Sequence, residues 1–128
     1  MSRFLLDTHT FLWWLKNSDK LGVKVREEIS NPDNNIYVSA ASIWEISIKK
    51  AIGKLEAPSN LTSIVKQKGF DQLPITLEHG EGIGELPDIH KDPFDRILIV
   101  QAQKENLIIV TNDRIIPKYK VNTLATIL

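Results

Sequence analysis

Short apolar runs occur at intervals along the chain, and each one stops abruptly at polar residues. Phe4-Leu5-Leu6 ends at Asp7, and Leu107-Ile108-Ile109-Val110 ends at Thr111-Asn112-Asp113. Runs of this length without polar alternation are typical of strands that are covered on both faces, as in a parallel sheet. Because an open parallel sheet binds its ligands at the carboxyl ends of its strands, the residues after both runs are candidate site positions.

The segments around these runs alternate between helical and strand-like patterns. Helices are predicted over residues 8–16, 20–30, 40–55, 61–68, 77–86 and 93–105, and strands over 3–6, 36–38, 70–75, 107–110 and 120–124. This order predicts an α/β fold with three α/β/α layers and a central, mainly parallel sheet of about five strands. The length of 128 residues fits one domain, 1–128.

Capping residues mark several of the predicted helix starts. Ser18 or Asp19 can cap the second helix, Ser39 can cap the third, and Asp92 can cap the last. Pro74 lies within the third predicted strand and favours a place at the sheet edge, since proline has no amide hydrogen to donate.

Composition and charge narrow the class of protein. Hydrophobic residues make up 42% of the chain and charged residues 25%, which suits a folded domain with a core. The formal net charge is zero, so overall charge gives no sign of nucleic-acid binding, although it does not exclude local basic patches. There is no cysteine, which excludes a disulfide framework and a thiolate zinc site. We expect a soluble cytoplasmic protein, because no segment resembles a signal peptide or a membrane span.

Four acidic residues are predicted to lie at the carboxyl edge of the sheet. They are Asp7, Glu45, Asp95 and Asp113. Glu45 is the one charged residue on a helical stripe with Ala41, Ile48 and Ile52. A glutamate in that environment is rarely buried unless it is paired or bound to a metal, so a buried pair with a lysine or arginine is the alternative.

The three aspartates of this set, and Asp92 close to Asp95, also have purely structural interpretations. Asp7 could cap the helix that follows it, and Asp113 could stabilise a turn. Asp92 is mainly an N-cap, and Asp95 at the third helical position could complete a capping box with it. Arg96 is the expected counter-charge for Asp95.

Four carboxylates that converge in one crevice would repel one another, and a bound divalent cation would offset that repulsion. Oxygen ligands without cysteine or histidine favour Mg²⁺ or Mn²⁺ over zinc. The three histidines show no zinc-binding spacing, and His90 could contact phosphate or support a ligand, although a plain loop histidine is the simpler interpretation. The Trp13-Trp14 pair is more typical of a core or interface than of a base-stacking platform.

Four segments, in chain order and spanning essentially the whole sequence, resemble the motifs of PIN domains, specifically the VapC type of bacterial toxin–antitoxin systems. They are Phe4-Leu5-Leu6-Asp7-Thr8-His9, Ser39-Ala40-Ala41-Ser42-Ile43-Trp44-Glu45, His90-Lys91-Asp92-Pro93-Phe94-Asp95-Arg96 and Val110-Thr111-Asn112-Asp113.

This resemblance implies a PIN-like fold and an endoribonuclease that hydrolyses RNA. It implies that Asp7, Glu45, Asp95 and Asp113 form the acidic set that holds Mg²⁺ or Mn²⁺. Asp92 matches a recurrent position of this subgroup, and Thr111 and Asn112 match the loop that presents the last aspartate. Thr8, His90 and Arg96 are further candidates for secondary roles at the site. The expected partners are an RNA substrate, a VapB-like antitoxin and a second copy of the chain, with no membrane. Two alternatives stay open: a catalytically silent PIN scaffold that binds RNA or protein, and a DNA-directed nuclease or phosphatase using the same acidic residues.

Overall fold

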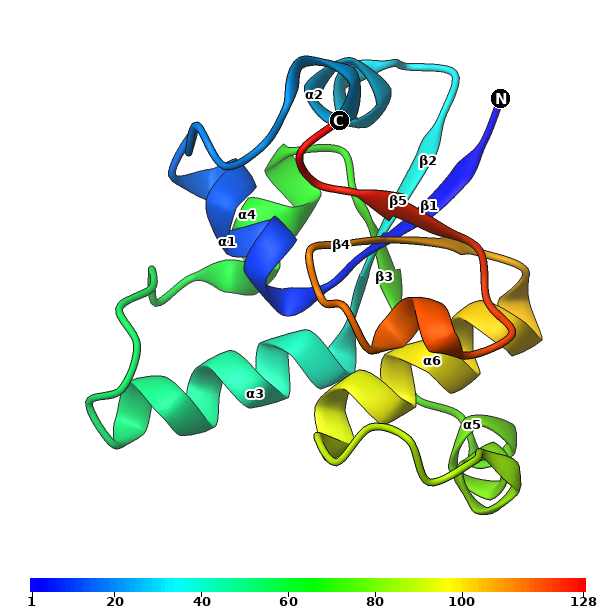
Figure 1. Cartoon of the computed structure of the whole chain (residues 1–128). Coiled ribbons are helices and arrows are strands. Elements are labelled where there is room, and N and C mark those ends of the chain that lie inside the picture. Colours follow the sequence, from blue (N-terminus) through cyan, green and yellow to red (C-terminus); the bar gives the residue numbers. More distant parts are fainter.

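The structure, a computed structural model, describes residues 1–128 and contains a central sheet flanked by helices (Figure 1). The strands are β1 (Arg3–Leu6), β2 (Asn35–Ser39), β3 (Asp71–Leu73), β4 (Ile108–Thr111) and β5 (Thr123–Ala125). The α-helices are α1 (Thr8–Leu15), α2 (Val23–Ser30), α3 (Ala40–Ala51), α4 (Leu61–Gln67), α5 (Leu77–Gly82) and α6 (Pro93–Glu105). Two short 3₁₀ helices follow α5 and β4: η1 (Ile83–Glu85) and η2 (Ile116–Lys118).

The five strands form one parallel sheet in the order β3-β2-β1-β4-β5, with β1 at its centre. The predicted α/β fold is therefore confirmed, and β3 lies at an edge as Pro74 indicated. Leu6 of β1 pairs with Val110 of β4, so the polar residues that follow the two strands begin side by side. In a parallel sheet every strand delivers its last residue to the same edge, which places Asp7 near Thr111–Asp113.

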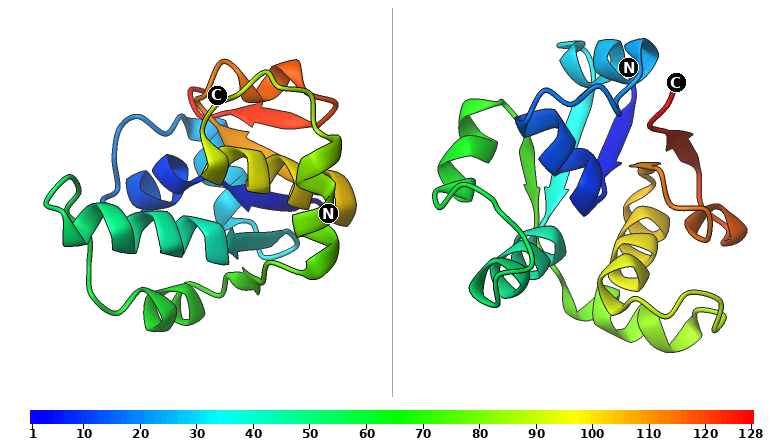
Figure 2. Two further views of the ribbon diagram at one scale, coloured as in Figure 1. Left: turned by 90° about the horizontal axis from the view of Figure 1, so that it is seen from below. Right: turned by 60° about the vertical axis from the view of Figure 1, so that its left-hand side comes forward.

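Alternate side chains of β1 enter different cores on the two faces of the sheet. Phe4 and Leu6 pack with apolar residues of α1, α2 and α4. Leu5 lies on the opposite face and packs with Leu98 and Ile99 of α6. The two faces are covered by different helices (Figure 2), which explains why the strand is apolar without alternation. No helix has both the length and the hydropathy needed to span a membrane.

The second helix begins later than predicted. Neither Ser18 nor Asp19 caps it, and Gly22 is its N-cap instead. The backbone N–H groups of Gly22 and Lys24 donate to the carbonyls of Thr126 and Leu128, at 2.7 Å each. A Cβ at Gly22 would lie 2.4 Å from the carbonyl oxygen of Ile127. The start of α2 thus depends on contact with the far end of the chain, which no local pattern reveals.

Three further boundaries differ from the prediction. Helix α3 ends at Ala51 rather than residue 55, because Gly53 has a φ of +75°. Its predicted apolar stripe is buried only near the start, and Ile52 is 60% exposed. The helix predicted over 77–86 is divided between α5 and η1, and the last strand lies at 123–125 rather than 120–124.

Candidate metal and catalytic site

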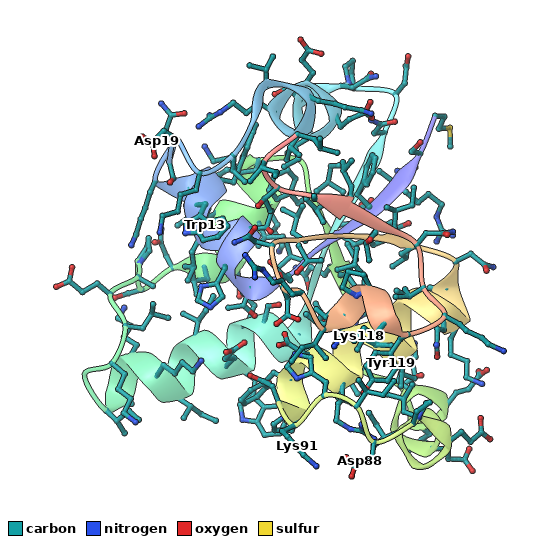
Figure 3. All side chains as sticks on the ribbon, viewed as in Figure 1. Trp13, Asp19, Asp88, Lys91, Lys118 and Tyr119 are labelled. Carbon is teal, nitrogen blue, oxygen red and sulfur yellow. The ribbon has the colours of Figure 1, made fainter.

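A hollow of about 360 Å³ opens where the carboxyl ends of β1 and β4 approach α3 and the start of α6. Eleven residues line it, and only one of them, Trp13, is hydrophobic. Trp13 is labelled in Figure 3. Five are carboxylates: Asp7, Glu45, Asp92, Asp95 and Asp113. The four acidic residues singled out in the sequence therefore face one cavity, together with Asp92. The other lining residues are Thr8, His9, Trp13, Lys49, His90 and Asn112.

Asp7 follows the last residue of β1 and is the N-cap of α1. Its Oδ1 accepts a hydrogen bond from the backbone N–H of Thr10 at 2.9 Å. Its Oδ2 accepts one from the hydroxyl of Thr111 at 2.5 Å. Burial raises the pKa of Asp7 despite these bonds. The same side chain therefore caps α1 and lines the hollow, so the two interpretations of Asp7 are compatible.

Glu45 lies in the second turn of α3 and is only 4% exposed. The hydroxyl of Thr8 donates to its Oε1 at 2.7 Å. The ammonium of Lys49, one helical turn later, lies 2.5 Å from its Oε2, and this contact raises the pKa of Lys49. The expected alternative, a buried glutamate paired with a lysine, is therefore present, but the pair itself lines the acidic hollow.

Asp92 is the N-cap of α6, as predicted. Its Oδ1 accepts hydrogen bonds from the backbone N–H groups of Phe94 and Asp95 at 2.8 and 3.1 Å. The reciprocal half of a capping box is absent, because the N–H of Asp92 donates to His90 Nδ1 rather than to Asp95. Asp95 Oδ2 instead lies 3.0 Å from His90 Nε2.

Arg96 is not the counter-charge of Asp95, which corrects the prediction. Its guanidinium turns away from the hollow and donates to the carbonyl of Pro87 at 3.0 Å and to the Tyr119 hydroxyl at 3.3 Å. The nitrogen that contacts Asp95 belongs to His90.

Asp113 is held by the turn that it begins. Its Oδ1 accepts from the backbone N–H groups of Ile115 and Ile116 at 2.7 and 3.0 Å, and its Oδ2 lies 3.2 Å from His90 Nε2. Burial alone would raise the pKa of Asp113, but the bonds from Ile116, Ile115 and His90 lower it below its ordinary value. Turn formation therefore leaves one oxygen of Asp113 directed toward the acidic cluster.

The cluster carries excess negative charge, and Asp95 shows the effect most strongly. Burial, followed by the charges of Asp92, Asp7, Asp113 and Glu45, raises the pKa of Asp95 to about 8. A divalent cation fits this donor set, because carboxylate oxygens are hard ligands whose repulsion a cation offsets. By distance alone, His90, Asp95 and Asp113 could also hold a metal ion, since one ligand atom from each lies within 4.8 Å of the others.

The sequence proposed no site role for three residues that line the hollow, Lys49, His9 and Trp13, and gave His90 only a secondary one. Lys49 follows Glu45 by four residues, which is the spacing of a helical ion pair, so its position could have been predicted. A plain loop histidine was the simpler interpretation of His90, yet His90 is buried between two carboxylates. Thr111 lies behind Asp7 rather than in the hollow, and Asn112 is exposed at its rim.

Comparison with solved structures shows a shared fold. A chain in the crystal structure of VapBC2 from Rickettsia felis bound to a promoter DNA fragment has a TM-score of 0.73 and 17% identity, with 96% of this chain and 98% of that chain covered. A chain of DNA-bound VapBC from Salmonella typhimurium has a TM-score of 0.68 and 19% identity, with 98% of each chain covered. The PIN domain endonuclease Utp24 has a TM-score of 0.57 and 15% identity, with 96% and 84% covered.

Sequence comparison gives a more specific result. No curated protein matches the chain in sequence. The family model of the PIN domain, however, matches residues 4–122. The matched region begins in β1 and includes every carboxylate of the hollow. The chain therefore belongs to the PIN domain family.

Proposed function

We propose that this protein is a divalent-metal-dependent endoribonuclease that hydrolyses RNA phosphodiester bonds and acts as the toxin of a VapBC-type toxin–antitoxin pair. One observation carries the catalytic part of the proposal: Asp7, Glu45, Asp95 and Asp113 line a single hollow at the carboxyl edge of a parallel sheet. PIN domains are generally nucleases. The carboxylates converge with too few basic side chains to balance their charge, which suits a reaction at phosphorus that depends on a bound cation.

Asp7, Glu45 and Asp95 would hold Mg²⁺ or Mn²⁺, directly or through water, and Asp113 would complete the set or orient the attacking water. When bound, the ion would supply the positive charge that offsets the charge developing on the phosphodiester. The protein holds these carboxylates in place beforehand: Thr111 binds Asp7, and Thr8 binds Glu45. Fixed ligands of this kind need little rearrangement when substrate binds.

The toxin part of the proposal concerns partners. Two of the structures with the same fold are VapBC complexes, which supports a VapB-like antitoxin as the partner of this chain. An apolar strip on α3 also supports a protein partner, which could be the antitoxin or a second copy of the chain. Trp44 and Ile48 of α3 and Ile52, the residue that ends the helix, follow one another at helical spacing and are 55%, 42% and 60% exposed.

The catalytic proposal is tested by incubating purified protein with single-stranded RNA and with DNA of the same sequence, in Mg²⁺, Mn²⁺ or EDTA. We expect internal cleavage of RNA that requires the metal, and its loss in Asp7→Asn and Asp95→Asn while the circular dichroism spectrum is unchanged. Full cleavage by both variants would end the assignment. RNA binding without cleavage at any Mn²⁺ concentration would favour the silent scaffold, and cleavage of DNA alone would favour a DNA nuclease.

The toxin role has a separate test. Expression of the wild-type chain in bacterial cells should arrest growth, and Asp95→Asn should not. Co-expression of the open reading frame immediately upstream should restore growth if it encodes the antitoxin. Growth unaffected by the active nuclease would leave the ribonuclease assignment standing and remove the toxin assignment.

A further inference from the structure

The His90 side chain contacts two carboxylates of the hollow, those of Asp95 and Asp113. Its Nε2 lies 3.0 Å from Asp95 Oδ2 and 3.2 Å from Asp113 Oδ2, and the residue is 7% exposed. Distances of this size allow two opposite roles. His90 could be a metal ligand, with a bare Nε2 lone pair, or a hydrogen-bond donor to the two carboxylates.

The opposite nitrogen of the ring distinguishes these roles. The backbone N–H of Asp92 donates to His90 Nδ1 at 3.2 Å. An amide N–H can only donate, so Nδ1 must be the nitrogen without a hydrogen, and in the neutral ring the hydrogen then resides on Nε2. A doubly protonated ring would place two N–H donors against each other at Nδ1. A ring that ligates a metal through Nε2 would carry its hydrogen on Nδ1 and meet the same conflict.

The backbone around His90 is fixed from the other side by Tyr119, which is 5% exposed. The Tyr119 hydroxyl accepts from the N–H of His90 at 2.7 Å and of Ile89 at 3.2 Å, and it donates to the carbonyl of Pro87 at 3.0 Å. Figure 3 shows Tyr119 on the side of the molecule where the loop with Asp88 and Lys91 lies. Tyr119 therefore holds the loop that carries the imidazole, and the contacts of Nδ1 and Nε2 hold the ring itself.

We propose that His90 is a positioning residue rather than a metal ligand. Held in the tautomer with hydrogen on Nε2, it shares that hydrogen between Asp95 and Asp113 and keeps their carboxylates together. The ion is left with oxygen ligands only, which favours Mg²⁺ or Mn²⁺ over Zn²⁺. This inference rests on the metal site of the proposed function and adds to it the reason for the metal preference.

The tautomer is measured directly by two-bond ¹H–¹⁵N NMR of the imidazole nitrogens in ¹⁵N-labelled protein at fixed neutral pH. We expect a protonated Nε2 and an unprotonated Nδ1 in His90, unchanged after addition of Mg²⁺ or Zn²⁺. His79 is an internal control, because its Nδ1 also accepts a backbone N–H, from Thr76 at 3.1 Å, outside the hollow. Exposed His9 should show a mixture of tautomers. A hydrogen on Nδ1 of His90, or its loss from Nε2 when Zn²⁺ is added, would overturn the proposal.

Two substitutions of His90 distinguish the role of its N–H donor from that of the imidazole ring. Glutamine can place an N–H near the position of Nε2, whereas the shorter asparagine reaches only the position of Nδ1. We expect His90→Gln to bind Mn²⁺, followed by electron paramagnetic resonance, nearly as tightly as wild type. His90→Asn should bind about 10–100-fold more weakly, as is typical when a partner of a metal ligand is lost.

Equal Mn²⁺ affinity in the two variants, or no Mn²⁺ binding by wild type, would contradict the role of His90. Failure of the wild-type protein to cleave RNA, with these binding results intact, would instead contradict only the proposed function. Should both variants unfold, the NMR measurement on wild type still decides the question.

Discussion

Helix α6 contacts two buried polar clusters, and they differ in how their charges are balanced. At its first turn lie the carboxylates of the acidic hollow. Two turns later, Gln101 accepts from the Ser39 hydroxyl at 2.6 Å and donates to the Pro74 carbonyl at 3.2 Å. His79 joins this second cluster and lies 2.9 Å from Glu105. We name the first the acidic cluster and the second, formed by Ser39, Gln101, His79 and Glu105, the amide cluster.

The comparison shows that burial of polar groups does not by itself mark a functional site. The amide cluster matches each donor with an acceptor from the protein, so it stabilises the contact between β2 and α6. The acidic cluster has five carboxylates, and the basic side chains in direct contact with them are Lys49 and His90. Unbalanced negative charge in a buried place raises the free energy of the folded protein when no ligand is bound. It is typical of sites where a bound ligand supplies the opposite charge.

The largest expected difference between the clusters is in catalysis. Glu45→Gln removes a carboxylate from the acidic cluster and should lower the rate of RNA cleavage at least about 100-fold, because losing even a partner of a metal ligand typically costs about 10–100-fold. Glu105→Gln removes the glutamate of the amide cluster and should leave the rate unchanged. Initial rates at saturating Mn²⁺ measure both. Similar losses in the two variants would show that folding rather than metal binding is being disturbed.

The second difference is in stability. Gln101→Leu leaves the hydrogen of the buried Ser39 hydroxyl without an acceptor and removes the donor to the Pro74 carbonyl. This should cost about 1–3 kcal/mol of unfolding free energy. Because no residue of the amide cluster lines the acidic hollow, the loss should be the same in Mg²⁺ and in EDTA. Urea denaturation in both buffers is the measurement. A loss that appeared only with Mg²⁺ would link the two clusters, contrary to our interpretation.

The third expected difference between the clusters is in how stability depends on pH. Without metal, the folded-state pKa of Asp95 is about 8, compared with an ordinary value of 3.8. Between these values the folded protein binds more protons than the unfolded chain, so the contribution of Asp95 to stability falls as pH rises through this range. Asp95→Asn should abolish that component, worth at most about 1.4 kcal/mol per pH unit, and become more stable than wild type near pH 8 in EDTA.

The control for this experiment is Asp88→Asn, because Asp88 is an exposed aspartate paired with exposed Lys91. Its pH dependence should follow that of wild type. The pKa assignment would be wrong if Asp95→Asn and Asp88→Asn gave parallel curves.

The smallest effect is expected at Lys49. Its pair with Glu45 is partly open to water, since the Lys49 side chain is 38% exposed, so Lys49→Met should change stability by less than about 1 kcal/mol. Removing this fixed positive charge should tighten Mn²⁺ binding, measured by calorimetry. Lys50→Met is the matched control, because Lys50 binds Ser59 and does not line the hollow. Weaker Mn²⁺ binding by Lys49→Met alone would mean that Lys49 supports the site instead of competing with the ion.

Much of the architecture was predictable because it depends on neighbours in sequence. The apolar run that forms β1 and the Ser39 and Asp92 caps are local features, and all are observed. Boundaries that depend on distant contacts were predicted less well. The start of α2 is set by Thr126–Leu128, and no pattern near Gly22 indicates that contact.

The sequence alone determined that several carboxylates would lie at one edge of a parallel sheet, because strand direction and the apolar runs require it. Only the tertiary structure decided which basic side chain pairs with each carboxylate. Arg96, next in sequence to Asp95, turns to Pro87 and Tyr119, whereas His90 reaches both Asp95 and Asp113. The physical reason is that the direction of a long side chain depends on which nearby groups accept its hydrogen bonds. Here the Tyr119 hydroxyl, from a distant segment, binds both Arg96 and the backbone of His90.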